Sequence, residues 1–182
     1  MSGEAGRSSE ALVTAFRGCV GEFATGVAVV TAEHEGLSAG MTLNSFTSVS
    51  LEPLLVLVSL ANGSRTLYVT RASGRFAVSI LRREQRDVAL DFSEPGAPFP
   101  HEQMTRTADG FLVVRGAAAT QHCEVAELIR AGDHDLVLGE VVGITHAGGE
   151  PLVFHKGRFG GMEVDAMVPP GHPIAIEEGA GW

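Results

Sequence analysis

The stretch "GMTLNSFTSVS", residues 40–50, carries six short hydroxyl or amide side chains just before the apolar run "LLVLVSL". Alternate side chains of a β-strand face opposite sides, so Thr42 and Asn44 share one face of this strand, opposite to Leu43. Short donors and acceptors beside a core suit the ring carbonyls and nitrogens of a flat polar heterocycle. An edge strand whose hydroxyls, such as that of Ser45, meet water or bond to the backbone is the alternative interpretation.

A second polar segment, "NGSRT" at 62–66, has the residue types of an anion site. Ser64 can cap a helix over 65–72, whose first amides lack acceptors within the helix and carry the positive end of its dipole. Arg65 and Thr66 add a cation and a hydroxyl. The segment predicts a phosphate-binding corner, and an ordinary capped helix with an exposed arginine is the alternative. Together with the heterocycle wall, the corner suits a nucleotide-like cofactor.

A third segment, "AGDHDLVLGEV" at 131–141, places a histidine at the start of a strand. Gly132 and Asp133 form the turn that precedes it. In this position the imidazole of His134 can point into a cleft. A structural or solvated histidine is the alternative interpretation.

Several common catalytic patterns are missing from the sequence. The histidines and cysteines show neither HExxH nor CxxC spacing, so we expect no metal site. No GxGxxG follows a predicted strand, and no phosphate loop with Gly-Lys-Ser/Thr exists.

The length and charge of the chain limit its class and its partners. Its 182 residues fit one domain over 11–162, between a flexible arm over 1–10 and a tail over 163–182. The net charge of -9 argues against nucleic acid, and no apolar run approaches the roughly 20 residues of a bilayer span. The N-terminus lacks the layout of a secretory signal. We therefore expect a cytoplasmic protein with no membrane partner, in which Cys19 and Cys123 are buried free thiols.

The spacing of apolar residues predicts the first element that would position these side chains. Leu12, Phe16 and Phe23 follow the helical period after Ser9, which is a suitable N-cap. The sequence therefore predicts a helix that begins at Ser9 and buries this face.

The rest of the chain is dominated by short strands. Apolar runs bounded by turn residues predict strands over 27–32, 41–46, 54–60, 75–81, 111–128, 134–146 and 151–159. Helical spacing appears at 65–72, before the left-handed terminator Gly74, and again at 83–92, while 93–103 is the longest irregular segment. Without strand and helix alternation, a parallel Rossmann sheet is excluded. The pattern favours a mainly β protein, built as a small antiparallel barrel with a few peripheral helices.

Six segments together resemble a known family. They are "FATGVAVVTA" at 23–32, "GMTLNSFTSVSLEPLLVLVSL" at 40–60, "SRT" at 64–66, "GRFAVSIL" at 74–81, "GDH" at 132–134 before "LGEV", and "PLVFHKGRF" at 151–159. In this order, over about residues 11–160, they resemble the flavin reductase family, whose small proteins supply reduced flavin to two-component monooxygenases. Each segment alone is unspecific, but the ordered set is specific.

The resemblance implies a split β-barrel with a Greek-key core, assembled as a homodimer with its two flavin sites near the subunit interface. It implies that the segment from Thr42 to Ser50 holds the isoalloxazine ring and the ribityl chain, partly through main-chain groups, with Thr25 near the ring. The flavin-binding residues implied in this way are Thr25, Thr42, Leu43, Asn44, Ser45, Ser48, Val49 and Ser50, with Ser64, Arg65 and Thr66 at the phosphate. Asp133 and His134 are implied on the nicotinamide side, and Arg158 as a further contact.

The resemblance also implies the reaction. A hydride passes from C4 of NADH or NADPH to N5 of oxidised FMN or FAD, and the reduced flavin leaves for a partner monooxygenase. The cofactors carry this chemistry, so no catalytic acid or base is expected. Two alternatives stay open: an oxidase or dehydrogenase that keeps its flavin bound, and a flavin-binding module without enzymatic activity.

Overall fold

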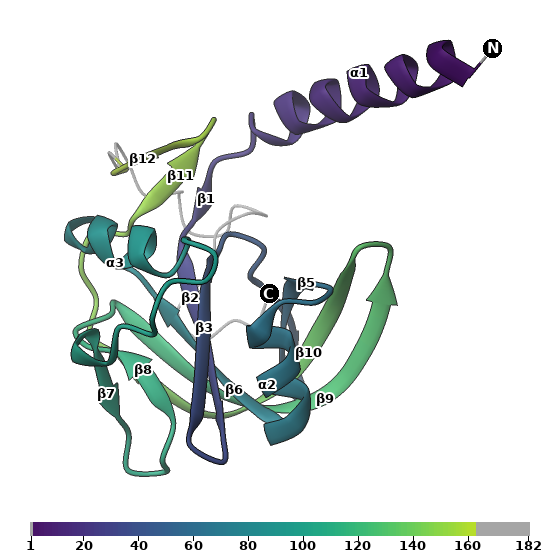
Figure 1. Cartoon of the computed structure of the whole chain (residues 1–182). Coiled ribbons are helices and arrows are strands. Elements are labelled where there is room, and N and C mark those ends of the chain that lie inside the picture. Colours follow the sequence, from purple (N-terminus) through teal and green to yellow (C-terminus); the bar gives the residue numbers. More distant parts are fainter. Residues whose placement is uncertain (1, 163–182) are drawn as a thin grey trace.

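The chain folds into a mainly antiparallel β structure, seen in a computed structural model that describes residues 2–162 (Figure 1). The longer strands are β2 (Ala28–His34), β3 (Leu37–Leu43), β4 (Thr47–Leu51), β5 (Leu54–Ala61), β6 (Arg75–Ile80), β9 (Ala119–Ala131) and β10 (His134–His146). The shorter strands are β1 (Thr25–Gly26), β7 (Met104–Arg106), β8 (Leu112–Val114), β11 (Val153–His155) and β12 (Arg158–Gly160). The helices are α1 (Ser2–Val20), α2 (Arg65–Ser73) and α3 (Arg86–Asp91), with short 3-10 turns η1 (Arg83–Gln85) and η2 (His101–Gln103). The prediction of a mainly β fold with few helices is confirmed, while the predicted tail over 163–182 lies outside the described residues.

The longer strands form one antiparallel sheet in the order β3-β2-β6-β9-β10-β5-β4. A second sheet has the order β1-β11-β12, and β7 pairs with β8. Figure 1 shows β9 and β10 as a long, curved hairpin that crosses the molecule. The two edges of the large sheet, β3 and β4, follow each other in the chain and are joined by residues 44–46. The split barrel stays a prediction, because the hydrogen-bonded order of the described strands is open between these edges.

Strand β2 is buried on both of its faces. Val30 belongs to one apolar cluster with Phe76, and Val29 belongs to a second cluster with Leu152. Side chains alternate along a strand, so neighbouring residues feed two cores on opposite sides of the sheet. Full burial of each valine contributes about 1.5–3 kcal/mol. Burial on both faces explains why this strand has a continuous apolar run instead of alternating polarity.

Helix α2 has the ends that the sequence predicts. The Ser64 hydroxyl accepts a hydrogen bond from the Leu67 amide at 3.2 Å, and Gly74 ends the helix with φ of 67°. The guanidinium of Arg71 pairs with the carboxylate of Asp135 on β10, whose side chain is only 2% exposed. The cap and this ion pair fix where the helix begins and how it lies against the sheet.

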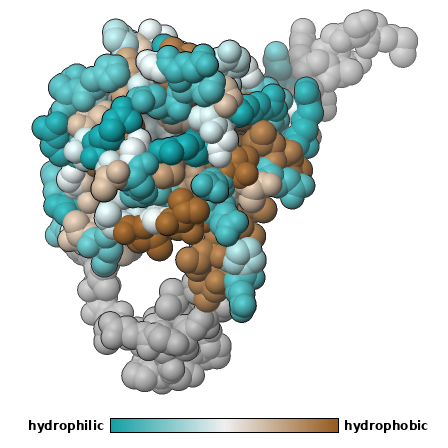
Figure 2. Space-filling view, turned by 90° about the horizontal axis from the view of Figure 1, so that it is seen from below, coloured by the Kyte–Doolittle hydropathy of each residue, from teal (hydrophilic) through white to brown (hydrophobic). Residues whose placement is uncertain are grey.

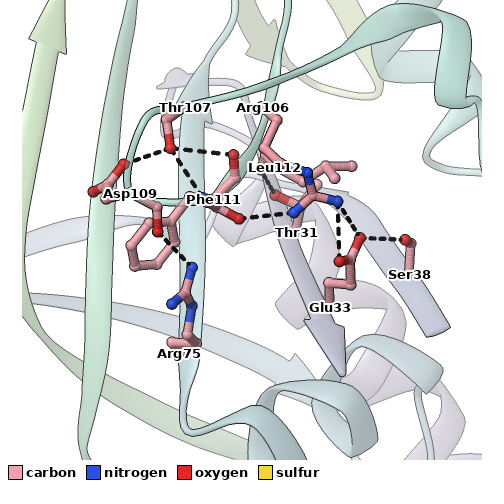
Figure 3. A network of polar contacts seen from close by, with 10 residues as sticks. Thr31, Glu33, Ser38, Arg75, Arg106, Thr107, Asp109, Phe111 and Leu112 are labelled. Carbon is pink, nitrogen blue, oxygen red and sulfur yellow. Dashed lines mark hydrogen bonds and ion pairs between the residues drawn. The ribbon is translucent and has the colours of Figure 1, made fainter. Parts of the chain in front are cut away.

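A polar network ties the β7–β8 hairpin to the β2–β3 hairpin (Figure 3). Nη2 of Arg106 donates to both carboxylate oxygens of Glu33, at 3.0 and 2.9 Å, and Ser38 donates to the same carboxylate at 3.0 Å. The hydrogen bond from Arg106 holds the pKa of Glu33 below its ordinary value. Nearby, the Arg75 guanidinium lies 3.9 Å from the centre of the Phe111 ring. The network fixes the β2–β3 hairpin from one side.

Helix α1 departs from two predictions. It begins at Ser2, before the predicted start at Ser9 and within the segment expected to be an arm, and Figure 1 shows it extending away from the sheet. Its apolar face is exposed: Leu12 is 71% and Phe16 65% exposed. Cys19 is exposed as well, so the prediction that it is buried is wrong, whereas Cys123 is buried as predicted. The helical period identified an apolar face but contained no information on what covers it.

Candidate active site

A cleft of about 460 Å³ lies between the start of α2, strand β3 and the segment 91–100. We call it the α2 cleft. It brings together four residues that the sequence singled out, namely Thr42, Ser64, Arg65 and Thr66. These residues come from two segments that are separated in the chain by strands β4 and β5.

The start of α2 keeps the features of an anion site. As the first residues of the helix, Arg65 and Thr66 have amides without an acceptor inside it. Thr66 is 3% exposed, whereas Arg65 is exposed and adds a full positive charge. The Ser64 hydroxyl is used by the cap itself. The capped helix is present, and the two amides and the guanidinium are the groups that could hold an anion there, so the phosphate-binding corner stays a prediction.

The turn between β9 and β10 lies beside this corner. The Asn62 amide donates to the carbonyl of Asp133 at 2.9 Å, and the Asn62 side chain donates to the carbonyl of Gly132 at 3.1 Å. His134 stands opposite Ala61 in the β5–β10 pairing. Nδ1 of His134 lies 2.8 Å from Oδ1 of Asp133, and this hydrogen bond holds the pKa of Asp133 below its ordinary value. The carboxylate orients an exposed imidazole near the anion corner.

Four hydroxyls of the polar stretch 40–50 bond within the chain, and that of Thr47 donates to the carbonyl of Ser48 at 3.2 Å. Thr42 donates to the carbonyl of Ala89 at 2.7 Å. The Ser45 hydroxyl accepts from the amide of Ser59 at 3.1 Å and donates to its carbonyl at 3.2 Å. The Ser50 hydroxyl accepts from the Glu52 amide at 3.1 Å. For these side chains the structure shows the hydrogen bonding to the backbone that the sequence left as the alternative, with distant partners for Thr42 and Ser45.

A second cleft, of about 410 Å³, contains Thr25 and Asn44 and is called here the β1 cleft. Phe23, Phe46 and Ile80 give it apolar walls. The Thr25 hydroxyl oxygen is buried and has no hydrogen-bond partner among the described residues. A buried polar atom without a partner destabilises the protein, and a ligand that supplies a suitable donor or acceptor would remove this penalty. The β1 cleft thus fits a flat ring with polar edges.

Other predicted residues lie outside these two clefts. The Leu43 side chain is 8% exposed and packs in the core, so only its main chain is free to meet a ligand. Ser48, Val49 and Ser50 line a shallow depression on β4. Arg158 lies exposed on β12, in the small sheet in which β11 pairs with Thr25. Their contacts with a ligand stay predictions.

The sequence reasoning missed the wall opposite α2. Residues 91–92 were predicted as the end of a helix and 93–100 as irregular, yet segment 91–100 lines one side of the α2 cleft. Gly40 allows this approach, because a Cβ there would lie 2.7 Å from the ring of Phe92. The amide of Thr42 donates to the carbonyl of Phe92 at 3.1 Å. The proline and glycine content predicted an irregular segment, and no local pattern indicated which surface that segment faces.

Comparison with known proteins gives a consistent result. Residues 20–163 match the model of the flavin reductase like domain. The chain is 39% identical over 145 residues to the FMN reductase (NADH) SmoA of Agrobacterium fabrum, covering 80% of this chain and 83% of that protein. It is 34% identical over 158 residues to HsaB of Mycobacterium tuberculosis, the reductase subunit of a flavin-dependent monooxygenase, covering 85% of this chain and 84% of that protein. A probable flavin reductase of Rhizobium meliloti is 38% identical over 161 residues, and the match spans 85% of this chain and 52% of that protein.

A solved structure extends the likeness to three dimensions. The NADH:FAD oxidoreductase SgcE6 of Streptomyces globisporus, in complex with NAD and FAD fragments, superposes with a TM-score of 0.78 at 36% identity. The match covers 83% of this chain and 93% of SgcE6. The resemblance drawn from six short segments is confirmed, and the chain belongs to the flavin reductase-like family.

Proposed function

We propose that the protein is an NADH-dependent flavin reductase that passes a hydride to free FMN or FAD. One observation carries the proposal. Thr42 and Asn44, two positions apart at the end of β3, line two different clefts, one with an anion corner and one with apolar walls and an unpartnered hydroxyl. A flavin nucleotide has the same two parts, a phosphate and a flat heterocycle with polar edges.

Each cleft supplies a different kind of contact. The Arg65 guanidinium and the amides of Arg65 and Thr66 bind the flavin phosphate. The hydroxyl of Thr25 and the amide of Asn44 meet polar edges of the ring, and Phe46 packs against its apolar part. Asn44 and Arg65 are exposed, so a flavin that they hold can leave after reduction.

The reaction transfers a hydride from C4 of the nicotinamide to N5 of the oxidised flavin. The side chain of Asp133 orients His134, which contacts the nicotinamide side. The protein brings the two rings into contact and fixes their orientation, which accounts for the catalysis without a proton-transfer residue. We accordingly assign no side chain as catalytic acid or base.

We propose a homodimer, held in part by α1. Leu12, Phe16 and Phe23, on and just after this helix, are exposed, which is costly for large apolar side chains in water. Figure 2 shows further hydrophobic side chains gathered on the face of the molecule that is seen from below. Burial of the exposed apolar face of α1 against a second copy would cover the open side of the β1 cleft, which Phe23 borders. In the same proposal, β3 and β4 bound the flavin as the edges of a split barrel.

We also propose a role in a two-component system in the cytoplasm. The reduced flavin leaves for a flavin-dependent monooxygenase, and the likeness to HsaB, the reductase subunit of such an enzyme, supports this role. Consumption of NADH supports the cytoplasmic location. In the part of the chain that the structure describes, no helix has the length and apolar composition to cross a membrane.

An anaerobic assay tests the proposal. Purified protein is mixed with NADH or NADPH and an excess of free FMN or FAD, and the loss of nicotinamide absorbance is followed. We expect many turnovers of free flavin with NADH. Reduction limited to one flavin per chain would indicate an oxidase or dehydrogenase, and flavin binding without reduction would indicate a binding module.

A further inference from the structure

We infer that Glu94 makes the α2 cleft selective for a ribose that carries no 2′-phosphate. The inference rests on the proposed function, because it concerns how the same site chooses between NADH and NADPH. It starts from the charges that line the α2 cleft, which are those of Arg65, Asp91 and Glu94. One cation therefore faces two carboxylates.

The single cation already has a ligand in the proposed function. Arg65 stands at the start of α2, where its guanidinium and the free amides bind the flavin phosphate. A second phosphate in the cleft would find no other arginine or lysine among its described lining residues. It would instead meet the wall formed by segment 91–100.

That wall presents its carboxylates from a fixed backbone. The amide of Ala97 donates to the carbonyl of Glu94 at 3.3 Å, and Gly96, with φ of 80°, takes the third position of the turn after Pro95. This is the pattern of a type II turn, which proline and glycine at these positions stabilise. Glu94 is the first residue of the turn.

The segment before and after the turn is anchored to the fold. The ring of Phe92 is buried, and Phe99 packs against it edge-on at 5.5 Å between centroids. The Ser93 hydroxyl donates to the carbonyl of Leu90 at 2.8 Å. Because both sides of the turn are held, Glu94 keeps its position at the cleft.

The two carboxylates differ in availability. Oδ2 of Asp91 accepts a hydrogen bond from the Gln103 side chain at 2.5 Å. Glu94 is exposed, and its carboxylate takes part in no hydrogen bond with the described residues. Glu94 is thus the group that is free to accept a hydrogen bond from a ribose hydroxyl. A 2′-phosphate in that position carries about -1.5 to -2 charges at neutral pH and is repelled instead.

Glu94→Gln removes the charge and keeps the shape of the side chain. We expect the preference for NADH, measured as the ratio of kcat/KM for NADH to that for NADPH, to fall about tenfold, with an unchanged KM for flavin. Glu102→Gln is the matched control, because Glu102 is exposed on η2 and does not line the cleft. An equal ratio in wild type, E94Q and E102Q would overturn the inference, as would a wild-type preference for NADPH.

A binding experiment separates this inference from the proposed function. Calorimetric titration with 5′-AMP and with 2′,5′-ADP compares the two ribose types without any turnover. We expect the wild type to bind 5′-AMP more tightly than 2′,5′-ADP. The ratio of the two Kd values should fall about tenfold in E94Q, and it should also fall with rising salt. Equal affinities in the wild type would overturn the role of Glu94. Loss of flavin turnover alone would overturn the reductase activity and leave the binding result to decide on Glu94.

Discussion

The two clefts at the end of β3 differ in how completely one chain builds them. The α2 cleft is enclosed by segments that bond to one another, through Thr42 with Ala89 and Phe92 and through the Asn62 contact with the β9–β10 turn. The β1 cleft borders the exposed Phe23, close to where α1 leaves the sheet, and contains a buried hydroxyl without a partner. One chain therefore encloses the proposed phosphate end by itself, whereas the proposed ring end would be completed by a ligand and by the second copy of the proposed dimer.

The largest effect on binding is expected from removing the cation of the α2 cleft. Arg65→Ala should raise the Kd for FMN about 100-fold, because charge-assisted hydrogen bonds to a phosphate are lost. Fluorescence titration of FMN measures this, with the exposed Arg86→Ala as control. Riboflavin has no phosphate, so its affinity should be the same in wild type and R65A; an equal loss for both ligands would contradict the phosphate role.

The next effect concerns the placement of α2. Arg71→Met leaves the buried carboxylate of Asp135 without its partner, which should lower the free energy of unfolding by about 3 kcal/mol. Urea denaturation measures the loss. The double variant R71M/D135L removes both charges and should recover most of the stability. If the double variant were as unstable as R71M, the ion pair would not be the cause.

Thiol reactivity tests whether a second copy covers α1. Burial raises the pKa of the Cys123 thiol to about 12, so a thiol reagent should modify only Cys19 in the native protein. If dimers bury this face, modification of Cys19 should slow about tenfold as protein concentration rises. Phe16→Glu should abolish the dependence of the Cys19 modification rate on protein concentration. Arg17→Glu, on the neighbouring face of α1, should reduce this dependence less. A rate independent of both concentration and F16E would argue against α1 as the interface.

A smaller effect is expected at the β1 cleft. Thr25→Val keeps the shape of the side chain and removes the unpartnered hydroxyl. If the flavin ring bonds to that hydroxyl, the Kd for both FMN and riboflavin should rise about fivefold, the value of one ordinary hydrogen bond. A tighter complex or a more stable protein without loss of affinity would show that the hydroxyl has no ligand role. Together, T25V and R65A separate the ring end from the phosphate end.

The smallest effect is expected at the turn beside the anion corner. His134→Ala should raise the KM for NADH about threefold while leaving the Kd for FMN unchanged, because its proposed contact is on the nicotinamide side. Steady-state kinetics with NADH and a titration with FMN measure the two quantities. Asp133→Asn should give a weaker change in the same direction, since it loosens the orientation of the imidazole. Unchanged kinetics in H134A would remove this residue from the site.

Local patterns predicted the parts of the fold that local forces decide. The Ser64 cap and the Gly74 terminator are set by neighbouring residues, and the structure has them where the sequence places them. The predicted strand over 111–128 is wrong as one element, because it divides into β8 and β9. A turn at Arg115 and Gly116, with φ of 71° at the glycine, separates the two strands, and β8 pairs with β7 whereas β9 pairs with β6 and β10.

The rest of the site depends on contacts between distant segments. The hydroxyl of Ser45 bonds to the backbone of Ser59, and segment 91–100 faces α2 across β3. Neither arrangement has a signature in its own stretch of sequence. The family resemblance supplied the order of the binding segments, but not which hydroxyls the chain uses for itself.

The pairing of β5 with β10 has a consequence for the folding pathway. The β9–β10 hairpin closes through the turn at Gly132 and Asp133, so it can form from local contacts. Arg65 comes to lie beside that turn only when β5 pairs with β10, whose paired residues are more than 70 positions apart in the sequence. Strand β6 must also take its place between β2 and β9. Loops of this length close late in folding, and domains dominated by such pairings fold in milliseconds to seconds. We therefore expect refolding protein to regain the hairpin before it regains flavin binding.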